Sequence, residues 1–289
     1  FAQMIRSPPL FAHIATLNGS DTLLLPLPYL FTTTVQTAQL VPEQTIIIPC
    51  LHDEGYAYLP EVRQAMTKAA GLAFLTDAEA KLAAELYPRE GQPRMVAGCG
   101  VQTQFAAEGE RFRQKFGISG DFLLYAGRPD FGKNVPLLVH YFQQYRQASG
   151  RDLTLVRIGP DKLAASYPHI VDLGFVAVQD KLDAYAAATL LCNPSKNESF
   201  SIVIMESWLA RRPVLVHADC APTREHCVKS NGGLYFGSYP EFAATLDFLL
   251  DWPNVARQMG ENGRSYVLNH FSWPQVTANY EQLLKQVME

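Results

Sequence analysis

The sequence lacks the patterns that mark a membrane span, a dinucleotide-binding loop or the phosphate-binding loop of NTPases. Its most apolar stretch, residues 23–31, is interrupted by Pro26 and Pro28, so no run reaches the length of a transmembrane helix. Neither a GxGxxG motif nor a P-loop lysine motif is present. The sequence therefore argues against a membrane-spanning protein, an NAD(P)-dependent dehydrogenase and an NTPase.

The sequence also lacks paired cysteines and an excess of basic residues, and both absences restrict the class of protein. The five cysteines contain no CxxC pair and their number is odd, which favours buried, reduced thiols and a cytoplasmic location over disulfides or a zinc site. The formal net charge of -4 lacks the basic excess of a general nucleic-acid binder. It leaves room for a local basic pocket that holds a phosphate.

What the sequence does contain is two successive series of short apolar strands that alternate with helices. In the first series we expect strands at residues 22–25, 45–48, 72–75 and 95–97, with helices at 56–70 and from the capping box at 76–79 to Tyr87. In the second we expect strands at 122–126, 153–158, 170–173, 189–193 and 214–217, with helices at 135–148, 180–188 and 201–210 and three later helical stretches. This alternation predicts parallel βαβ units. A short linker helix at 108–116, ended by Gly117, places the boundary between two α/β domains at 117/118.

A loop with two cations follows the strand at 122–126 and precedes a helix. Gly127, Arg128 and Lys133 lie in this loop, where cations, glycine and a helix N-terminus suit a pyrophosphate. The alternative is a solvated loop whose charges pair with Asp130. Two more glycines, Gly159 and Gly174, follow the next two strands. A glycine at such a position allows the backbone to approach a flat ligand closely, or it serves only to form a tight turn.

Two carboxylates, Glu198 and Glu206, follow the strand at 189–193. Glu206 lies within an apolar helix, so its charge requires donors, either a cation or backbone group of the protein or the hydroxyls of a bound sugar or ribose. Glu198 precedes the helix start, where a carboxylate can serve as an N-terminal charge cap or contact a ligand. In the first series, His52 ends a buried strand and is expected to face the same cleft between the domains, as a substrate contact or as a structural hydrogen-bonding residue.

Taken together, the motifs resemble the nucleotide-sugar glycosyltransferases of family 4, which have the GT-B fold. The resemblance covers about residues 122–289 in the order of the family motifs and is looser over the first domain. It is carried by Gly127-Arg128 with Lys133, Ile158-Gly159-Pro160, Leu173-Gly174-Phe175-Val176, Asn193-Pro194-Ser195, Glu198-Ser199-Phe200-Ser201 with Glu206, Arg212-Pro213-Val214 with Glu225, and Phe271-Ser272-Trp273.

The resemblance implies a fold, an activity and a set of site residues. The fold would be two Rossmann-like α/β domains, with a helix at 271–289 crossing back to the first. The activity would be transfer of a hexose from a UDP- or GDP-sugar to a sugar, lipid or small-molecule acceptor, with retention of anomeric configuration and without a metal or other cofactor. The catalytic set would be Arg128 and Lys133 on the diphosphate, Glu198 on the sugar and His52 beside the reacting centre. Glu206 would bind the ribose and the backbone of Phe175 and Val176 the base, while Gly127, Gly159, Ser199, Phe200, Ser201 and Ile202 complete the donor-binding set.

The chain also departs from the family pattern. Ser199 and Ser201 stand where the family usually has glycine, and they are expected to narrow the pocket around the sugar or phosphate. The opening strand with its glycine-rich loop is not found, so we expect an N-terminal segment to be missing before Phe1. Two rival functions remain, a sugar phosphorylase or hydrolase of the same fold and a non-catalytic sugar-nucleotide-binding protein. No nucleic-acid partner is expected, and no strongly basic amphipathic helix supports membrane association.

Overall fold

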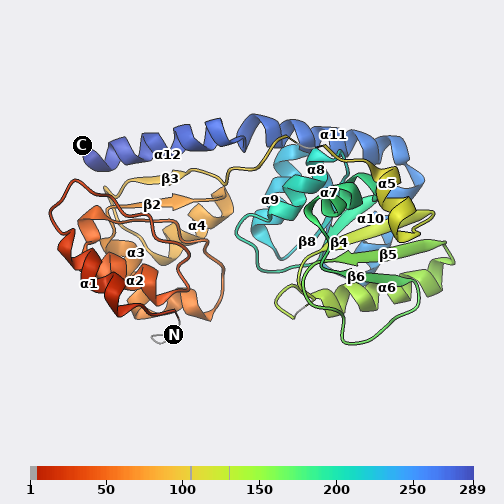
Figure 1. Ribbon diagram of the computed structural model, residues 1–289, viewed down its shortest axis with the longest axis horizontal. Helices are drawn as coiled ribbons and strands as arrows, with labels where there is room; N and C mark the ends of the chain where they lie inside the picture. The colour runs from red at the N-terminus through yellow and green to blue at the C-terminus, as the bar shows by residue number, and fades with distance from the viewer. Residues whose placement is uncertain (1–4, 105, 130) are drawn as a thin grey trace. The chain divides into compact units, whose positions relative to one another are not determined.

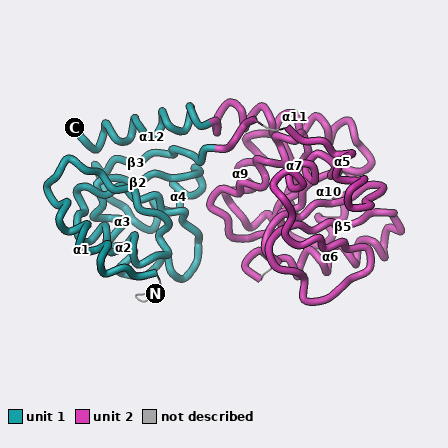
Figure 2. Tube along the Cα trace, viewed as in Figure 1, with its two compact units in different colours: residues 1–100, 273–289 teal, residues 101–272 magenta. Residues whose placement is uncertain are grey.

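The computed structural model describes residues 5–104, 106–129 and 131–289. The chain divides into two compact units, coloured separately in Figure 2. Unit 1 comprises Phe1–Gly100 together with Trp273–Glu289, and unit 2 comprises Val101–Ser272. Unit 1 is therefore discontinuous in sequence, because the whole of unit 2 is inserted between its two segments.

Unit 1 contains a parallel three-stranded sheet with helices packed around it (Figure 1). Its strands are β1 (Ile46–Ile47), β2 (Gly71–Phe74) and β3 (Arg94–Val96), in that order across the sheet. Its helices are α1 (Pro8–Thr16), α2 (Thr32–Leu40), α3 (Pro60–Lys68), α4 (Asp77–Leu86) and α12 (Trp273–Met288), with 3-10 turns at Pro42–Gln44 and Gly55–Tyr58. Thr76 caps α4 by accepting a hydrogen bond from the backbone N–H of Glu79 at 3.1 Å, as the capping-box pattern predicts.

The last helix, α12, completes the core of unit 1. Leu283 is buried with Ile46, Ala73 and Ala97 from the sheet. The side-chain amide of Asn279 donates to the carbonyl of Ala97 at 3.1 Å. A Cβ atom at Gly100 would lie 2.5 Å from the Trp273 ring, so the start of α12 packs directly on that turn. The prediction that the final helix returns to the first α/β unit agrees with this packing.

Unit 2 contains a parallel six-stranded sheet of order β6-β5-β4-β7-β8-β9 (Figure 1). The strands are β4 (Asp121–Ala126), β5 (Leu153–Ile158), β6 (Ile170–Gly174), β7 (Leu190–Asn193), β8 (Val214–His217) and β9 (Gly233–Phe236). The helices are α5 (Gly109–Phe116), α6 (Val135–Ser149), α7 (Val178–Ala187), α8 (Ile202–Leu209), α9 (Ala221–Ser230), α10 (Tyr239–Asp251) and α11 (Pro253–His270). Every residue of the central strand β4 after Asp121 is buried, as expected for a parallel strand covered on both faces. The predicted α/β class with parallel βαβ units is confirmed.

Several predicted elements of unit 1 differ from the observed ones. The strand expected at 22–25 is a single bridge between Leu24 and Thr45. The helix expected at 56–70 is divided into a 3-10 turn and α3, because Leu59 precedes Pro60 and takes an extended conformation with ψ 138°. Helices α1 and α2 of unit 1 were not expected, nor were α9 and β9 of unit 2.

The division between the units falls at 100/101, whereas the sequence placed it at 117/118. The expected linker helix, α5, belongs to unit 2 because it is anchored to α7. The guanidinium of Arg111 donates to the Asp183 carboxylate at 2.5 Å and 2.7 Å, and Lys115 pairs with Asp180 at 2.7 Å. The returning chain leaves unit 2 beside its entry point, since the N–H of Val101 donates to the carbonyl of Phe271 at 2.8 Å.

Candidate functional site

The carboxyl ends of β4, β5 and β6 converge through their glycine turns. The N–H of Gly127 donates to the carbonyl of Ile158, and the N–H of Gly159 donates to the carbonyl of Gly174, both at 2.9 Å. Gly159 has φ +137°, and a Cβ atom there would lie 2.4 Å from the carbonyl oxygen of Gly127. The Gly159 turn thus requires glycine for two reasons, its backbone conformation and the close approach of the neighbouring turn.

Arg157, which the sequence analysis did not single out, fixes these turns from inside β5. Its guanidinium is 1% exposed and donates to the carbonyls of Gly127, Pro160 and Asp161. It also pairs with the Asp172 carboxylate at 2.8 Å. Burial opposes ionisation of Asp172, but hydrogen bonds from the Leu163 N–H, from Arg157 and from the Gly174 N–H outweigh it and hold the pKa of Asp172 below its ordinary value.

The loop between β4 and α6 lies against the loop that follows β7. The ammonium of Lys133 pairs with the Glu198 carboxylate at 2.9 Å, and the side-chain amide of Asn134 donates to the carbonyl of Pro194 at 3.0 Å. Arg128 is exposed, and its carbonyl accepts from the Tyr125 hydroxyl at 2.7 Å. Lys133 and Glu198, predicted separately to contact the diphosphate and the sugar, are therefore in direct contact. Asp130, the partner in the solvated-loop alternative, lies outside the described residues.

The segment from Glu198 into α8 is shaped by its two serines and one phenylalanine. Ser201 precedes α8 in the left-handed region, with φ 72°, and its hydroxyl accepts from the Asn193 side-chain amide at 2.9 Å. Phe200 is 3% exposed and its ring packs edge-on against His226 and Phe271. Ser199 is half-buried beside Glu198. Ser201 thus places a hydrogen-bonded hydroxymethyl group where the backbone conformation would favour glycine.

Glu206 has two protein partners on α7. Lys181 pairs with it at 2.5 Å, and the Tyr185 hydroxyl donates to its other carboxylate oxygen at 2.9 Å. Burial, reinforced by the negative charge of Glu206, raises the pKa of Tyr185 well above its ordinary value, so the hydroxyl stays a donor. The sequence alone allows either protein or ligand groups as partners of Glu206, and the structure supplies protein groups. The spacing of Lys181 and Tyr185, four residues apart on one helix, is the sequence signal that could have identified them.

Exposed apolar side chains accompany these polar groups at the strand ends. Phe175, which follows Gly174, is 82% exposed, and Ile202 at the start of α8 is 50% exposed. Val176 is half-buried. An aromatic ring left this exposed beside glycine turns can stack on a flat ligand.

His52 belongs to unit 1, whereas the other predicted site residues belong to unit 2. It follows β1, and its Nδ1 atom lies 3.4 Å from a carboxylate oxygen of Glu54. The loop that carries His52 is held by Glu79, whose buried carboxylate accepts from the backbone N–H groups of Leu51 at 2.7 Å and Leu75 at 2.6 Å. Glu79 was predicted only as part of a capping box, yet its side chain joins the ends of β1 and β2.

Within residues 5–104, 106–129 and 131–289, no three His, Cys, Asp or Glu side chains gather in an arrangement that could hold a metal ion. In the same ranges, no helix combines the length and the apolar character that crossing a membrane requires.

Comparison with known proteins finds a family match over part of unit 2. Residues 120–251 match the family described as "Glycosyl transferases group 1". The alpha-D-kanosaminyltransferase of Streptomyces kanamyceticus is 27% identical over 219 residues, which are 69% of this chain and 56% of that protein. The MMP alpha-(1->4)-mannosyltransferase of Mycolicibacterium hassiacum is 32% identical over 110 residues, which are 35% of this chain and 26% of that protein. The chain thus spans about half the length of the first of these relatives.

Solved structures share the whole architecture at low identity. The sucrose-phosphate synthase of Thermosynechococcus elongatus has a TM-score of 0.79 and 18% identity, covering 97% of this chain and 78% of that one. Anabaena HepE in complex with UDP and glucose has a TM-score of 0.78 and 14% identity, covering 96% of this chain and 81% of that one. These likenesses confirm the predicted GT-B fold. Residues 120–251 thus resemble the glycosyl transferases group 1 family, on a chain with the fold of the GT-B glycosyltransferases.

Proposed function

We propose that this protein is a retaining, metal-independent glycosyltransferase of family 4 that moves a hexose from a nucleoside-diphosphate sugar to an acceptor. The observation that carries the proposal is the contact between Lys133 and Glu198 at the carboxyl ends of β4 and β7. In an open α/β sheet this edge is where ligands bind. The relatives named above as a kanosaminyltransferase and a mannosyltransferase support the same class of reaction.

In the proposed reaction, the bond between the anomeric carbon and the diphosphate oxygen breaks, and the acceptor oxygen bonds to that carbon on the same face of the sugar. Negative charge then grows on the departing diphosphate, to which the proton of the acceptor hydroxyl passes. Lys133 and Arg128 are the groups proposed to stabilise that charge. Electrostatic stabilisation of charge that develops in the transition state is usually the largest single contribution to catalysis. Glu198, now paired with Lys133, would accept hydrogen bonds from the sugar hydroxyls.

The nucleoside is proposed to bind beside the same turns. Glu206 would accept hydrogen bonds from the ribose, held in position by Lys181 and Tyr185. The backbone at Phe175 and Val176 would meet the base, and the exposed Phe175 ring offers a stacking surface. HepE, whose structure is described in complex with UDP and glucose, makes UDP-sugars the first donors to test.

The test is a screen of UDP-, GDP- and ADP-sugars for protection against thermal unfolding, followed by measurement of nucleotide release with a panel of acceptors. A specific donor at a hundred times its Kd stabilises the folded state by roughly 2.7 kcal/mol, so its midpoint shift is readily measured. If none of the donors shifts the midpoint, the proposal is wrong. Binding without turnover over any acceptor would favour a sugar-nucleotide-binding protein, and turnover only with inorganic phosphate would favour a phosphorylase.

A further inference from the structure

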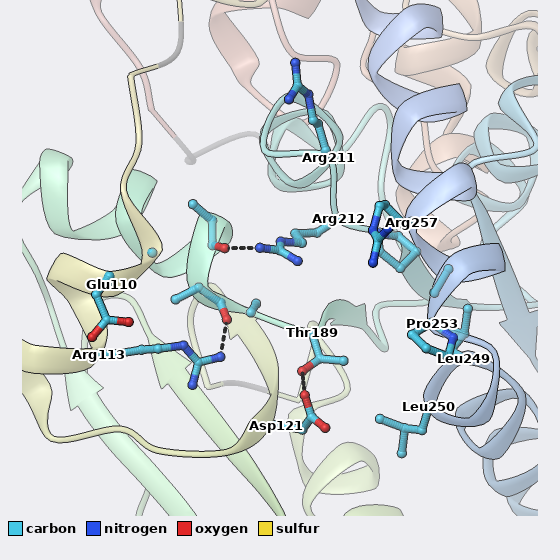
Figure 3. A pocket seen from close by; sticks show the side chains of 16 residues that line it. Glu110, Arg113, Asp121, Thr189, Arg211, Arg212, Leu249, Leu250, Pro253 and Arg257 are labelled. Carbon is cyan, nitrogen blue, oxygen red and sulfur yellow. Dashed lines mark hydrogen bonds between the residues drawn. The ribbon is translucent and has the colours of Figure 1, made fainter.

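Unit 2 has a pocket at the opposite end of its sheet from the glycine turns, and its lining is drawn in Figure 3. Its volume is about 440 Å³. It is lined where the strands begin, by Asp121 at the start of β4, Thr189 just before β7 and Pro213 just before β8. Helices α5, α10 and α11, the end of α7 and the turn of Arg211 and Arg212 supply the rest of its wall. None of the residues proposed above for donor binding lines it.

Three arginines from separate elements face this pocket. Figure 3 shows Arg113 of α5, Arg212 of the turn before β8 and Arg257 of α11 directed toward its middle, while Arg211 points away. Arg211 pairs instead with Glu261 at 3.3 Å. Glu110 and Asp121 also line the pocket, but among the described residues no acidic side chain forms an ion pair with any of the three inward arginines. This concentration of positive charge stands out in a chain whose formal net charge is -4.

Arg212 shows that the cluster is electrostatically unsatisfied. One end of its guanidinium donates to the carbonyl of Ala186, but its Nε atom is buried and has no hydrogen-bond partner in the described part of the chain. Burial, together with the charges of Arg113 and Arg257, lowers the pKa of Arg212 below its ordinary value. A buried N–H donor without a partner is costly, and an anion in the pocket would satisfy both the donor and the charge.

Two of the three arginines, Arg113 and Arg212, are held in place before any ligand arrives. Arg113 donates to the carbonyls of Gly120 and Ala187, both at 2.7 Å. The turn that carries Arg212 is fixed by α11, because a Cβ atom at Gly260 would lie 2.1 Å from the carbonyl oxygen of Arg211. Arg211 itself adopts φ 61°, a left-handed conformation that is costly for a side chain of this size. A rigid, strained turn that presents a guanidinium fits a preformed binding site better than a solvated surface.

We propose that this pocket binds the phosphate monoester of a small hydroxylated compound, at a site separate from the proposed donor site. A phosphate dianion can accept charge-assisted hydrogen bonds from guanidinium groups on several sides at once. The pocket is larger than an inorganic phosphate needs. Thr189 and Asp121, which hydrogen-bond each other at 2.8 Å, offer polar groups for ligand hydroxyls, and Leu249, Leu250 and Pro253 offer an apolar wall.

The experiment titrates inorganic phosphate and then a hexose 6-phosphate at constant ionic strength, and follows backbone amide resonances of Ala187, Ala188 and Thr189 by NMR. Arg257→Gln is the test variant, because its exposed side chain can be replaced without disturbing the fold. Arg63→Gln is the charge-matched control, an exposed arginine on α3 of unit 1. Lys133→Ala serves as a background in which phosphate binding at the proposed donor site is weakened.

We expect saturable shifts at these amides, stronger binding of the hexose 6-phosphate than of phosphate, and a loss of affinity of roughly tenfold in Arg257→Gln. Arg63→Gln and Lys133→Ala should bind as the unmodified protein does. Amides that do not move, or an Arg257→Gln affinity equal to that of Arg63→Gln, would overturn the proposal. Because no nucleotide sugar is used, either result leaves the proposed transferase function to be judged separately.

Discussion

Lys133 and Glu198 are the residues at which the proposed chemistry can be tested most directly. We predict that Lys133→Ala and Glu198→Gln each lower kcat/KM for transfer by roughly 100-fold to 1000-fold, the usual cost of removing a group that stabilises developing charge. The pair is partly exposed, 29% for Lys133 and 15% for Glu198, so both variants should stay folded. Steady-state kinetics with the donor found by the screen, together with thermal melts, measures both effects.

The control is Lys196→Ala in the same loop region, which removes an exposed lysine paired with Asp219 at 2.8 Å and should leave transfer almost unchanged. Because Lys133 and Glu198 touch, the double variant should lose less than the product of the two single losses. Full activity in both single variants would remove the proposed roles.

Glu79 carries a pH-dependent contribution to stability. Burial raises the pKa of Glu79 from its ordinary 4.5 to about 7, although backbone N–H groups of Leu75, Leu51, Thr76 and Cys50 oppose the shift. The folded state therefore binds more protons at Glu79 than the unfolded state between these values, so the contribution of Glu79 to the free energy of unfolding is highest below about pH 4.5 and falls as the pH rises to 7. Above pH 7 this contribution is constant.

We predict that Glu79→Gln removes this fall, which amounts to roughly 3 kcal/mol for a shift of this size. Urea unfolding at several pH values between 5 and 8 measures it. Glu85→Gln, an exposed position on the same helix, should keep the same dependence of the free energy of unfolding on pH as the unmodified protein. If the free energy of unfolding of Glu79→Gln depends on pH as that of the unmodified protein does, Glu79 is not the cause of that dependence.

At the scale of the element, β5 holds the strand-end turns together through Arg157. We predict that Arg157→Met lowers the free energy of unfolding by roughly 3 kcal/mol, because it leaves the mostly buried Asp172 carboxylate without its cation. The loss of its hydrogen bonds to Gly127 and Pro160 should also weaken donor binding. Chemical unfolding and donor titration measure the two effects.

Arg151→Met is the comparison for this prediction. Arg151 pairs with Asp247 at 3.1 Å and Asp251 at 2.6 Å, but with 35% of its side chain exposed it should contribute less than about 1 kcal/mol. Adding Asp172→Leu to Arg157→Met should recover part of the lost stability, because it removes the unpaired charge. If the double variant is no more stable than the single one, the ion pair is not the reason for the loss.

The elements of unit 2 were more predictable from the sequence than those of unit 1. Strands β5 and β8 coincide with the predicted residues, because each is a short apolar run bounded by turn residues. Helix α2 escaped prediction because its threonine-rich sequence has low helix propensity and depends on burying Val35 and Ala38 against other elements. The role of Arg157 could not be predicted because its partners are mainly backbone carbonyls of loops, and a backbone carbonyl is present whatever the residue type.

At the scale of the whole molecule, α12 determines the stability of unit 1. We predict that Leu283→Ala destabilises unit 1 by roughly 2–4 kcal/mol, since it opens a cavity among Ile46, Ala73 and Ala97. Hydrogen exchange should accelerate at β2 and β3 and remain unchanged at β4 and β7. Leu268→Ala on α11, where the side chain is 37% exposed, should leave the hydrogen-exchange rates of both units unchanged. Equal acceleration in both units would mean that they unfold together.

The interruption of unit 1 by unit 2 also sets the order in which the two cores can form during synthesis. A ribosome completes residues 101–272 before it makes residues 273–289, which supply Leu283 and the rest of α12. Unit 2 can therefore fold while unit 1 still lacks one side of its core, although unit 1 is the first to emerge. The usual order, in which the N-terminal domain folds first, therefore does not follow from the order of synthesis here, because the core of unit 1 needs Leu283.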